Sequence, residues 1–204
     1  MTDAFKAVRD FEQALCRYTG APYAVTVSSC TAALFLAVKY CIPKFPLWRG
    51  DFIIPRYTYV SVPQCIIHAG GRVFFDNRTW RGTYGLTPYP IHDSARRFTS
   101  GQYRGGYECV SFHRAKILGL GQGGAILHDD PEADIWFRKA RFDGRTEGVP
   151  PKEDTPTMLG HHCYLSPDAA ASGLWLLSYL PKHNDDLPND DYRDLSLTDW
   201  ESLR

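Results

Sequence analysis

Short apolar runs of strand type alternate along this chain with segments whose apolar residues recur at helical spacing. An N-terminal helix is predicted by the spacing of Phe5, Val8, Phe11 and Leu15, with Thr2 or Asp3 as its cap and Gly20 at its end. Strands are predicted at 23–28, 52–55, 72–76, 89–93, 108–112 and 125–128, and further helices at 31–41, 61–69, 132–142 and 167–180. This alternation predicts an α/β fold of three layers, in which a mainly parallel sheet carries helices on both faces.

Composition narrows the class of protein. The chain has 204 residues, of which 44% are hydrophobic and 23% charged, as in ordinary soluble globular proteins. Disorder throughout, a collagen-like fibre and a small disulfide scaffold are excluded. The longest apolar runs are far shorter than the roughly 18–20 residues of a membrane span. The first 15 residues carry charges among their apolar positions and show no signal-peptide core, so we expect a cytoplasmic protein without a membrane partner.

The charges are divided unevenly. The formal net charge is zero, but residues 183–204 carry a net −5 and residues 1–182 a net +5. The positive excess suits an anionic small molecule and is too weak to indicate nucleic acid. We therefore expect one domain over 1–182 and a solvated acidic tail over 183–204. Docking residues in that tail would be Leu195, Leu197, Trp200 and Leu203.

The cysteines do not form a metal-binding pattern. The chain has six cysteines, with no C-x-x-C pair, and we interpret Cys16, Cys41, Cys65 and Cys109 as small core residues. The run 161–163 (HHC) has no second ligand pair at a suitable spacing. We expect no metal site.

A glycine-rich run, 119–124 (GLGQGG), formally matches the dinucleotide fingerprint G-x-G-x-x-G. That fingerprint should follow a strand and open a helix, whereas here the glycines lead into the strand-like run AILHDD. We therefore expect a loop that lets backbone pass close to a bound molecule or to another chain, and no nicotinamide site.

Three features carry candidate chemistry. Residues 28–31 (SSCT) stand between a strand and a helix, where free N–H groups and hydroxyls can bind a phosphate; a simple Ser/Thr helix cap is the stronger interpretation of this feature alone. Asp93 ends an apolar strand, at the sheet edge where α/β proteins bind ligands. Lys116 lies in an otherwise uncharged run, where its pKa can fall far enough for Schiff-base chemistry. Together they are the parts that pyridoxal phosphate requires.

In these features the sequence resembles the DegT/DnrJ/EryC1/StrS family of sugar aminotransferases, which use pyridoxal phosphate on the fold type I scaffold. The resemblance runs from about residue 11 to about residue 180. It rests on six blocks in the family's order: SSCTAAL, GDFIIPRYTYVSVPQCIIHAGGRVFFD, IHDSARRFTSG, VSFHRAKILGLGQGGAIL, RFDGR and GHHCYLSPDAAASGL. The block SFHRAK with the glycine loop behind it is the most specific.

The resemblance implies roles for individual residues. Lys116 matches the Schiff-base lysine, which also moves the proton between the cofactor and the substrate carbon. Asp93 matches the carboxylate that pairs with the pyridinium nitrogen, and Tyr59 the aromatic residue that stacks on the ring. The phosphate would be held by Ser29, Cys30, Thr31 and Ser111.

The sequence also departs from the family's pattern. Gly is usual where Cys30 stands, and Gln or His where Arg96 stands, beside the cofactor's phenolic oxygen. A guanidinium there would favour the phenolate or capture a substrate carboxylate. His162 replaces the asparagine that a neighbouring subunit extends to the phosphate. Family members are roughly twice as long and carry a C-terminal small domain, so the resemblance implies a short form without that domain.

The function implied is transamination of a keto-sugar attached to a nucleotide, with an amino acid such as glutamate as the donor. A two-fold homodimer would share its active sites. Two alternatives stay open. One is a sugar-modifying enzyme of another reaction type, such as a dehydratase, although dehydratases of the family replace the lysine by His. The other is a degenerate scaffold that binds without turnover, as the changes at Cys30, Arg96 and His162 and the short length would allow.

Overall fold

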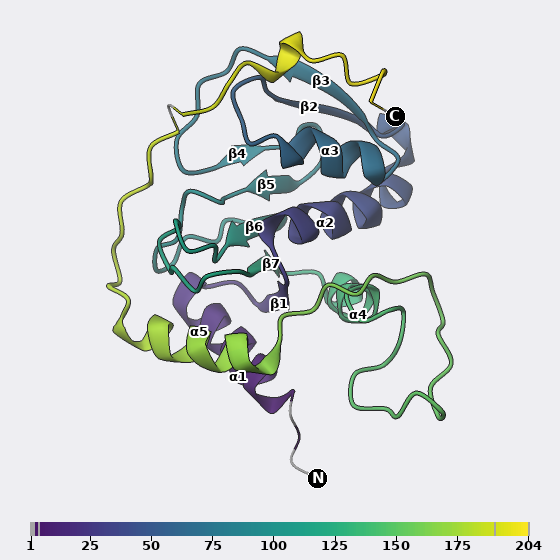
Figure 1. The fold of residues 1–204 in the computed structure, drawn as a ribbon, viewed down its shortest axis with the longest axis vertical. Coiled ribbons are helices and arrows are strands. Elements are labelled where there is room, and N and C mark those ends of the chain that lie inside the picture. Colours follow the sequence, from purple (N-terminus) through teal and green to yellow (C-terminus); the bar gives the residue numbers. More distant parts are fainter. Residues whose placement is uncertain (1–2, 4, 190, 204) are drawn as a thin grey trace.

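The computed structural model describes residues 3, 5–189 and 191–203 (Figure 1). Its α-helices are α1 (Lys6–Thr19), α2 (Cys30–Lys44), α3 (Ser61–His68), α4 (Pro131–Ala140) and α5 (Pro167–Tyr179), with 3₁₀ turns η1 (Pro46–Trp48) and η2 (Leu195–Leu197). The strands are β1 (Tyr23–Val27), β2 (Asp51–Pro55), β3 (Arg72–Asp76), β4 (Tyr84–Gly85), β5 (Ile91–Asp93), β6 (Tyr107–Ser111) and β7 (Gly124–His128). Each helix and strand predicted from the sequence is present within a few residues of its expected bounds. The short strand β4 was not predicted.

The first helix ends as expected and begins differently. Gly20 closes α1 in the left-handed conformation, with φ 83°, and its N–H donates to the carbonyl of Cys16. Phe5 precedes the helix without a side-chain cap. Asp3 instead turns its carboxylate to Arg9, and Thr2 lies outside the described residues. The interpretation of Asp3 as the cap is therefore wrong.

The sheet is mixed, whereas the sequence predicted mainly parallel pairing. Its strand order is β1-β7-β6-β5-β4, and β2 and β3 pair separately. The pairs β5–β6 and β2–β3 are parallel, while β1–β7, β6–β7 and β4–β5 are antiparallel. A parallel connection needs a crossover, usually a helix, and residues 112–123 between β6 and β7 contain none. The chain therefore turns back on itself at the glycine loop.

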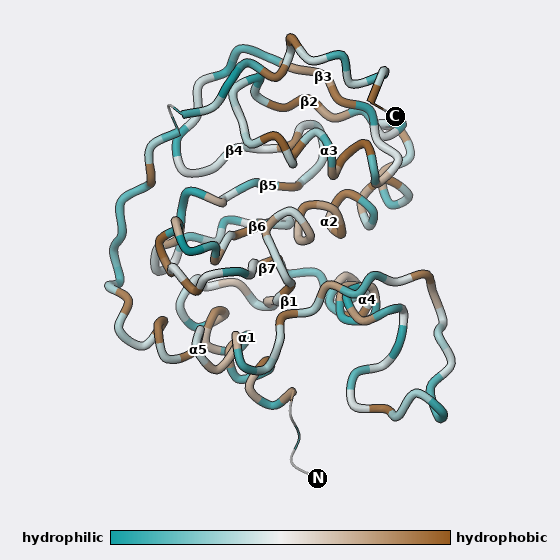
Figure 2. The backbone as a smooth tube through the Cα atoms, in the orientation of Figure 1, coloured by the Kyte–Doolittle hydropathy of each residue, from teal (hydrophilic) through white to brown (hydrophobic). Residues whose placement is uncertain are grey.

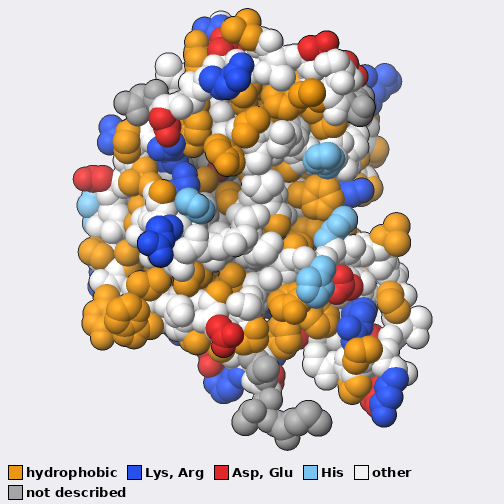
Figure 3. Space-filling view, viewed as in Figure 1, with side chains coloured by type: hydrophobic (Ala, Val, Ile, Leu, Met, Phe, Trp, Pro, Cys, Tyr) orange, Lys and Arg blue, Asp and Glu red, His pale blue; other side chains and the backbone are white. Residues whose placement is uncertain are grey.

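Helices cover both faces of the sheet, as predicted. One hydrophobic cluster joins the sheet to α2, α3 and α4, and includes Leu36, Ile66 and Phe137. A second cluster joins the opposite face to α1 and α5, and includes Phe11, Leu127 and Ala170. Figure 2 shows apolar stretches along α2 and the strands. An exposed apolar patch remains on α5, where Trp175 and Tyr179 are 63% and 73% exposed and hydrophobic side chains gather at the lower left of Figure 3.

The C-terminal segment (residues 183–203) packs against the domain, although the sequence predicted a solvated tail. It runs from the end of α5 along the left-hand side of the sheet towards β2 and β3 (Figure 1). Leu195 is only 1% exposed, and the ring of Trp200 lies 6.4 Å from that of Phe75. Leu197 and Leu203, the other expected docking residues, are 81% and 68% exposed.

The cysteines are free, and Cys41, Cys65 and Cys109 are buried as predicted, while Cys16 is half-buried. Among the residues that the structure describes, no group of histidine, cysteine and carboxylate side chains could hold a metal ion. No helix in this described part is long and apolar enough to cross a membrane.

Candidate active site at the ends of β5 and β6

The predicted catalytic residues lie where two parallel strands end side by side. Asp93 is the last residue of β5 and pairs in register with Cys109 of β6. Ser111 ends β6, and Lys116 follows in the turn beyond it. Parallel strands bring their carboxyl ends to one edge of the sheet, which is where open α/β folds bind ligands.

Asp93 is a buried carboxylate whose environment suits a bound N–H donor. Its side chain accepts hydrogen bonds from the Tyr84 hydroxyl at 2.9 Å and from the backbone N–H of Ala95 at 2.9 Å. The residue is 5% exposed, and burial raises the pKa of Asp93 despite these two donors. Among the described residues, no cationic group forms an ion pair with it. A ligand that presents a positively charged ring N–H would supply such a partner.

Lys116 is a half-buried amine in the same electrostatic neighbourhood. Burial lowers the pKa of Lys116, and the positive charge of Arg96 lowers it further, while Asp93 acts in the opposite direction. Within the described residues its Nζ makes no hydrogen bond or ion pair. An amine in this setting is available as a nucleophile and as a proton carrier.

The N-terminus of α2 approaches this edge as an anion-binding element. Ser29 is its N-cap, and its hydroxyl accepts the N–H of Ala32 at 3.1 Å, so the cap interpretation is confirmed. The hydroxyls of Thr31 and Ser61, at the starts of α2 and α3, are 2.8 Å apart. Two helix N-termini thus meet at one place, where N–H groups favour a phosphate. Cys30 is buried beside them, and burial raises the pKa of its thiol well above the ordinary value.

The glycine loop pairs through its backbone with the residues that lead from β6 to Lys116. The N–H of Phe112 donates to the carbonyl of Gly123, and His113 bridges to Gly121. Gly123 and Gly121 adopt φ 145° and 113°, which L side chains rarely allow. A Cβ at Gly124 would lie 2.6 Å from the backbone N of Cys30. The close backbone approach at this loop is to the start of α2 in the same chain, and the expected approach to a bound molecule or to another chain stays a prediction.

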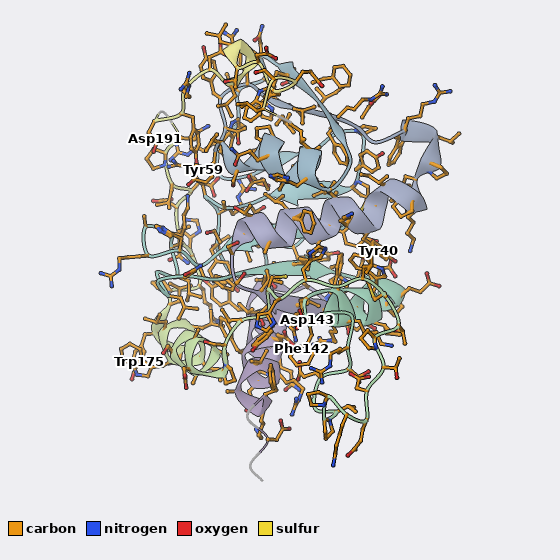
Figure 4. All side chains as sticks on the ribbon, turned by 45° about the vertical axis from the view of Figure 1, so that its right-hand side comes forward. Tyr40, Tyr59, Phe142, Asp143, Trp175 and Asp191 are labelled. Atoms are coloured by element: carbon orange, nitrogen blue, oxygen red, sulfur yellow. The ribbon has the colours of Figure 1, made fainter. Side chains whose placement is uncertain are left out.

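Tyr59 and Arg96 stand on the open side of the site. Tyr59 precedes α3 and is 56% exposed. Arg96 is held by the C-terminal segment: its Nε donates to the Tyr192 hydroxyl at 2.8 Å and its Nη2 to Asp191 at 2.5 Å. The ring of Tyr192 lies 6.4 Å from that of Tyr59, and Tyr59 and Asp191 are labelled on the same side of the molecule in Figure 4.

His162 directly precedes Cys163, whose carbonyl accepts the N–H of Ser28 at 2.7 Å, just before the Ser29 cap. The His162 side chain is 70% exposed, and its Nδ1 lies 2.8 Å from Asp143 Oδ2. His162 stands at the end of the long loop after α4, where it forms an antiparallel bridge with Phe142 at the start of that loop.

Sequence reasoning missed Tyr84, Thr58 and Tyr192. Tyr84 links Asp93 to Thr58, because its hydroxyl also lies 2.5 Å from Thr58 Oγ1. A two-residue strand is too short to show an alternating pattern, so no signal marked Tyr84. Tyr192 stands in a charged run that is typical of a solvated segment, and nothing local predicted its contact with Arg96.

Comparison with known proteins identifies the family of this chain. A family model described as the DegT/DnrJ/EryC1/StrS aminotransferase family matches residues 1–83 and 91–186. The match includes Asp93 and Lys116, together with the start of α2.

Solved structures share the fold. PseC of Helicobacter pylori, an aminotransferase involved in the biosynthesis of pseudoaminic acid, is 18% identical, with a TM-score of 0.71 over 89% of this chain and 64% of its own. The sugar aminotransferase CalS13 of Micromonospora echinospora is 19% identical, with a TM-score of 0.72 over 86% and 61%. DesI, solved in the presence of its TDP-sugar product, is 20% identical, with a TM-score of 0.65 over 86% and 53%. The chain thus spans a little over half to about two thirds of these proteins' lengths.

Proposed function

We propose, because the chain belongs to the DegT/DnrJ/EryC1/StrS aminotransferase family, that it transfers an amino group to a keto-sugar. The observation that carries the proposal is the pairing of two groups at one sheet edge. Asp93 is a buried carboxylate with no cationic partner among the described residues, and Lys116 is a half-buried amine within its electrostatic reach. Such an arrangement is suited to a ring cofactor that has both a basic nitrogen and an aldehyde.

Pyridoxal phosphate is the cofactor of this family, and the residues present fit it. It supplies an electron sink that stabilises negative charge on a substrate carbon. Asp93 would hold the ring N–H, and its ionised form would gain a cationic partner there. Tyr59 would cover one face of the ring, and Arg96 would donate to the phenolic oxygen.

The phosphate would lie at the meeting of α2 and α3. Backbone N–H groups of Cys30 and Thr31 and the hydroxyls of Ser29 and Ser111 are the donors on offer. Ser29 keeps its hydroxyl proton, because its oxygen accepts from Ala32 as the helix cap. The dipoles of both helices favour the negative charge.

Lys116 would do the proton transfer. Its Nζ would carry the proton that is removed from the substrate carbon in one half of the reaction and returned to carbon in the other half. Burial and Arg96 hold the pKa of Lys116 below its ordinary value, which raises the fraction of neutral amine near pH 7. The turn that carries Lys116 is fixed by its own N–H, which donates to the carbonyl of His113 at 2.8 Å.

The finer points of the function are proposals of the same kind. A nucleotide-linked keto-sugar is supported by DesI, which was solved with a TDP-sugar product, and glutamate by the resemblance to the family. We propose a homodimer in which His162 reaches the partner's site, a domain over 1–182 with residues 183–204 as its C-terminal segment, and a cytoplasmic location.

Reduction with borohydride tests the proposal. The protein incubated with pyridoxal phosphate should show a visible absorption band, which reduction removes, and peptide mapping should place the pyridoxyl group on Lys116. Lys116→Ala should lose the band, whereas Lys152→Ala, at a lysine that is 83% exposed, should keep it. Labelling at another lysine would contradict the assignment. A band that glutamate leaves unchanged would favour binding without turnover.

A further inference from the structure

The C-terminal segment binds the guanidinium of Arg96 at each of its three nitrogens. The Tyr192 hydroxyl accepts from Nε, Asp191 accepts from Nη2, and the carbonyl of Pro188 accepts from Nη1. The Arg96 side chain is 11% exposed. A planar guanidinium presents its donors as a fixed fork, and here a phenol, a carboxylate and a carbonyl occupy its three nitrogens.

Tyr192 places an aromatic ring beside the residues that line the open side of the site. The ring centroid lies 4.6 Å from Arg96 Cζ, 6.0 Å from the ring of Trp80 and 6.4 Å from that of Tyr59. The hydroxyl lies close enough to the site to feel its charges: besides burial, which raises the pKa of Tyr192, Arg96 acts to lower it and Asp93 to raise it. An aromatic ring whose phenolic oxygen is bound by Arg96 is also what pyridoxal phosphate would present there.

The contacts with Arg96 lie between two independent anchors. On one side, Asp186 pairs with both Nε and Nη2 of Arg97, and the N–H of Leu187 donates to the carbonyl of Arg96 at 2.9 Å. On the other side, Leu195 is buried and its N–H donates to the carbonyl of Arg56 at 2.9 Å. Between the anchors the described residues make further contacts, since Asn189 donates to the carbonyl of Trp80 at 2.9 Å and Asp194 lies 3.4 Å from the Arg56 guanidinium. Release from Arg96 would therefore also have to loosen the Asn189 contact.

We propose that Pro188, Asp191 and Tyr192 form an internal ligand of the cofactor site, which pyridoxal phosphate must displace from Arg96. The inference rests on the proposed function. The phenolic oxygen of the cofactor and the Tyr192 hydroxyl are acceptors of the same kind, and they would compete for the Nε–H of Arg96, because that nitrogen carries a single N–H. Asp191 supplies negative charge near Arg96 and Lys116 in the apo protein, and the anionic cofactor replaces that charge when it binds.

Equilibrium binding of pyridoxal phosphate to the full chain tests the competition. The double variant Asp191→Asn/Tyr192→Phe keeps the size of both side chains and weakens their hold on Arg96. We expect it to bind pyridoxal phosphate about three- to tenfold more tightly than the unaltered protein. The control is Asp185→Asn/Tyr179→Phe, which makes the same chemical changes at side chains that are 92% and 73% exposed and should leave the affinity unaltered.

Hydrogen exchange gives a second readout that does not depend on activity. Adding pyridoxal phosphate to the unaltered protein should speed exchange in peptides covering 188–194, while the amides of Leu187 and Leu195 stay protected by their anchor bonds. Weaker or equal binding by the double variant, or slower exchange over 188–194, would overturn the inference, because the segment would then be part of the holo site. Absence of cofactor binding in all three proteins would instead contradict the proposed function itself.

Discussion

Tyr84 and Asp93 face each other across β4 and β5, and the Tyr84 hydroxyl donates to Asp93 Oδ2 at 2.9 Å. Both residues are buried, at 5% exposure each. Burial raises the pKa of Asp93, and the bonds from Ala95 and Tyr84 oppose that rise. The unpredicted strand β4 thus supports the ionised form of the carboxylate that the cofactor ring would need.

Removing the Tyr84 hydroxyl should weaken cofactor binding. In Tyr84→Phe the pKa of Asp93 rises further, because a hydrogen bond that favours the charged form is lost. We expect affinity for pyridoxal phosphate to fall about three- to tenfold, measured by titration of the absorption spectrum. Tyr89→Phe is the control, since the Tyr89 hydroxyl is also buried but accepts from the N–H of Gly50. Equal losses in the two variants would mean that the effect is not specific to Asp93.

Asp93→Asn should stabilise the apo protein while it impairs the reaction. A carboxyl whose folded pKa lies above its unfolded pKa binds more protons in the fold, so it lowers stability as pH rises through that window. The amide removes this penalty. At pH 8 we expect about 1 kcal/mol of added stability, or about 2–4 °C in Tm, and the gain should shrink as the pH is lowered towards the unfolded pKa of an aspartate, about 4.

The functional half of that prediction needs a separate measurement. The uncharged amide introduced by Asp93→Asn cannot hold the ring nitrogen in its protonated state, so the single-turnover rate with glutamate should fall by at least about tenfold. Calorimetry at the two pH values and rapid-mixing spectroscopy on the same preparation separate the two effects. An unaltered rate would rule out this role for Asp93.

Much of the fold could be predicted because its elements are local. Helical spacing and short apolar runs located the helices and the longer strands, and Gly20 marked the end of α1. The direction of strand pairing could not be predicted in the same way, because it depends on how residues 112–123 return. Residues 112–123 show no helical pattern, and a parallel connection usually needs a helix, so this segment indicates that β6 and β7 pair antiparallel.

For the candidate site too, the residues at strand ends could be predicted from local pattern, and the long-range contacts could not. Asp93 and Lys116 follow strands that the apolar pattern reveals, so their positions at one sheet edge follow from the topology. The contacts of the C-terminal segment join residues about ninety positions apart, such as Arg97 with Asp186 and Arg96 with Asp191. The acidic composition of the segment alone predicts that it is solvated. It packs against the domain because Arg96 and Arg97, in a loop far away in sequence, bind its carboxylates.

Arg96 should control the protonation of Lys116. Burial lowers the pKa of Lys116, and the neighbouring positive charge lowers it further. In Arg96→Gln that pKa should rise, so the pH midpoint for acetylation of the Lys116 amine should move upward. Competitive labelling followed by peptide mass spectrometry measures the midpoint. Arg97→Gln should leave it in place, since the Arg97 guanidinium is engaged by Asp186; equal midpoints in all three proteins would refute the coupling.

A buried ion pair remote from the site should dominate the pH dependence of stability. Glu12 is 3% exposed and accepts from Arg141 at 2.5 Å and Arg138 at 2.7 Å, and Arg141 is fully buried. Burial opposes ionisation, but the two arginines hold the pKa of Glu12 below its ordinary value. Its contribution is therefore present above the unfolded pKa of a glutamate and is lost as the pH falls through the folded one.

Glu12→Gln should accordingly destabilise the fold by about 3 kcal/mol at pH 7, because it leaves the buried Arg141 guanidinium with Glu147, at 3.2 Å, as its remaining carboxylate partner. Glu132→Gln is the matched control, since that carboxylate is 84% exposed and lies 3.5 Å from Lys44. Urea unfolding at pH 7 and pH 4 measures both variants. A loss at Glu12 no larger than that at Glu132 would show that the pair contributes only what a surface contact does.

His162 should complete the cofactor site of a second subunit. It is 70% exposed and oriented by Asp143, so its ring is free to meet a partner, and a hydrogen bond to the phosphate would be worth about tenfold in affinity. We expect His162→Ala to bind pyridoxal phosphate about that much more weakly, with an unaltered Tm, and His183→Ala, at a histidine that is 85% exposed, to bind normally.

Mixing His162→Ala with Lys116→Ala subunits gives the sharper measurement, because the mixed dimer contains one site with both native residues and should regain high-affinity binding in half of its sites. Sedimentation of a monomer that binds the cofactor fully, or mixed dimers without any regain, would assign His162 to the surface of its own chain.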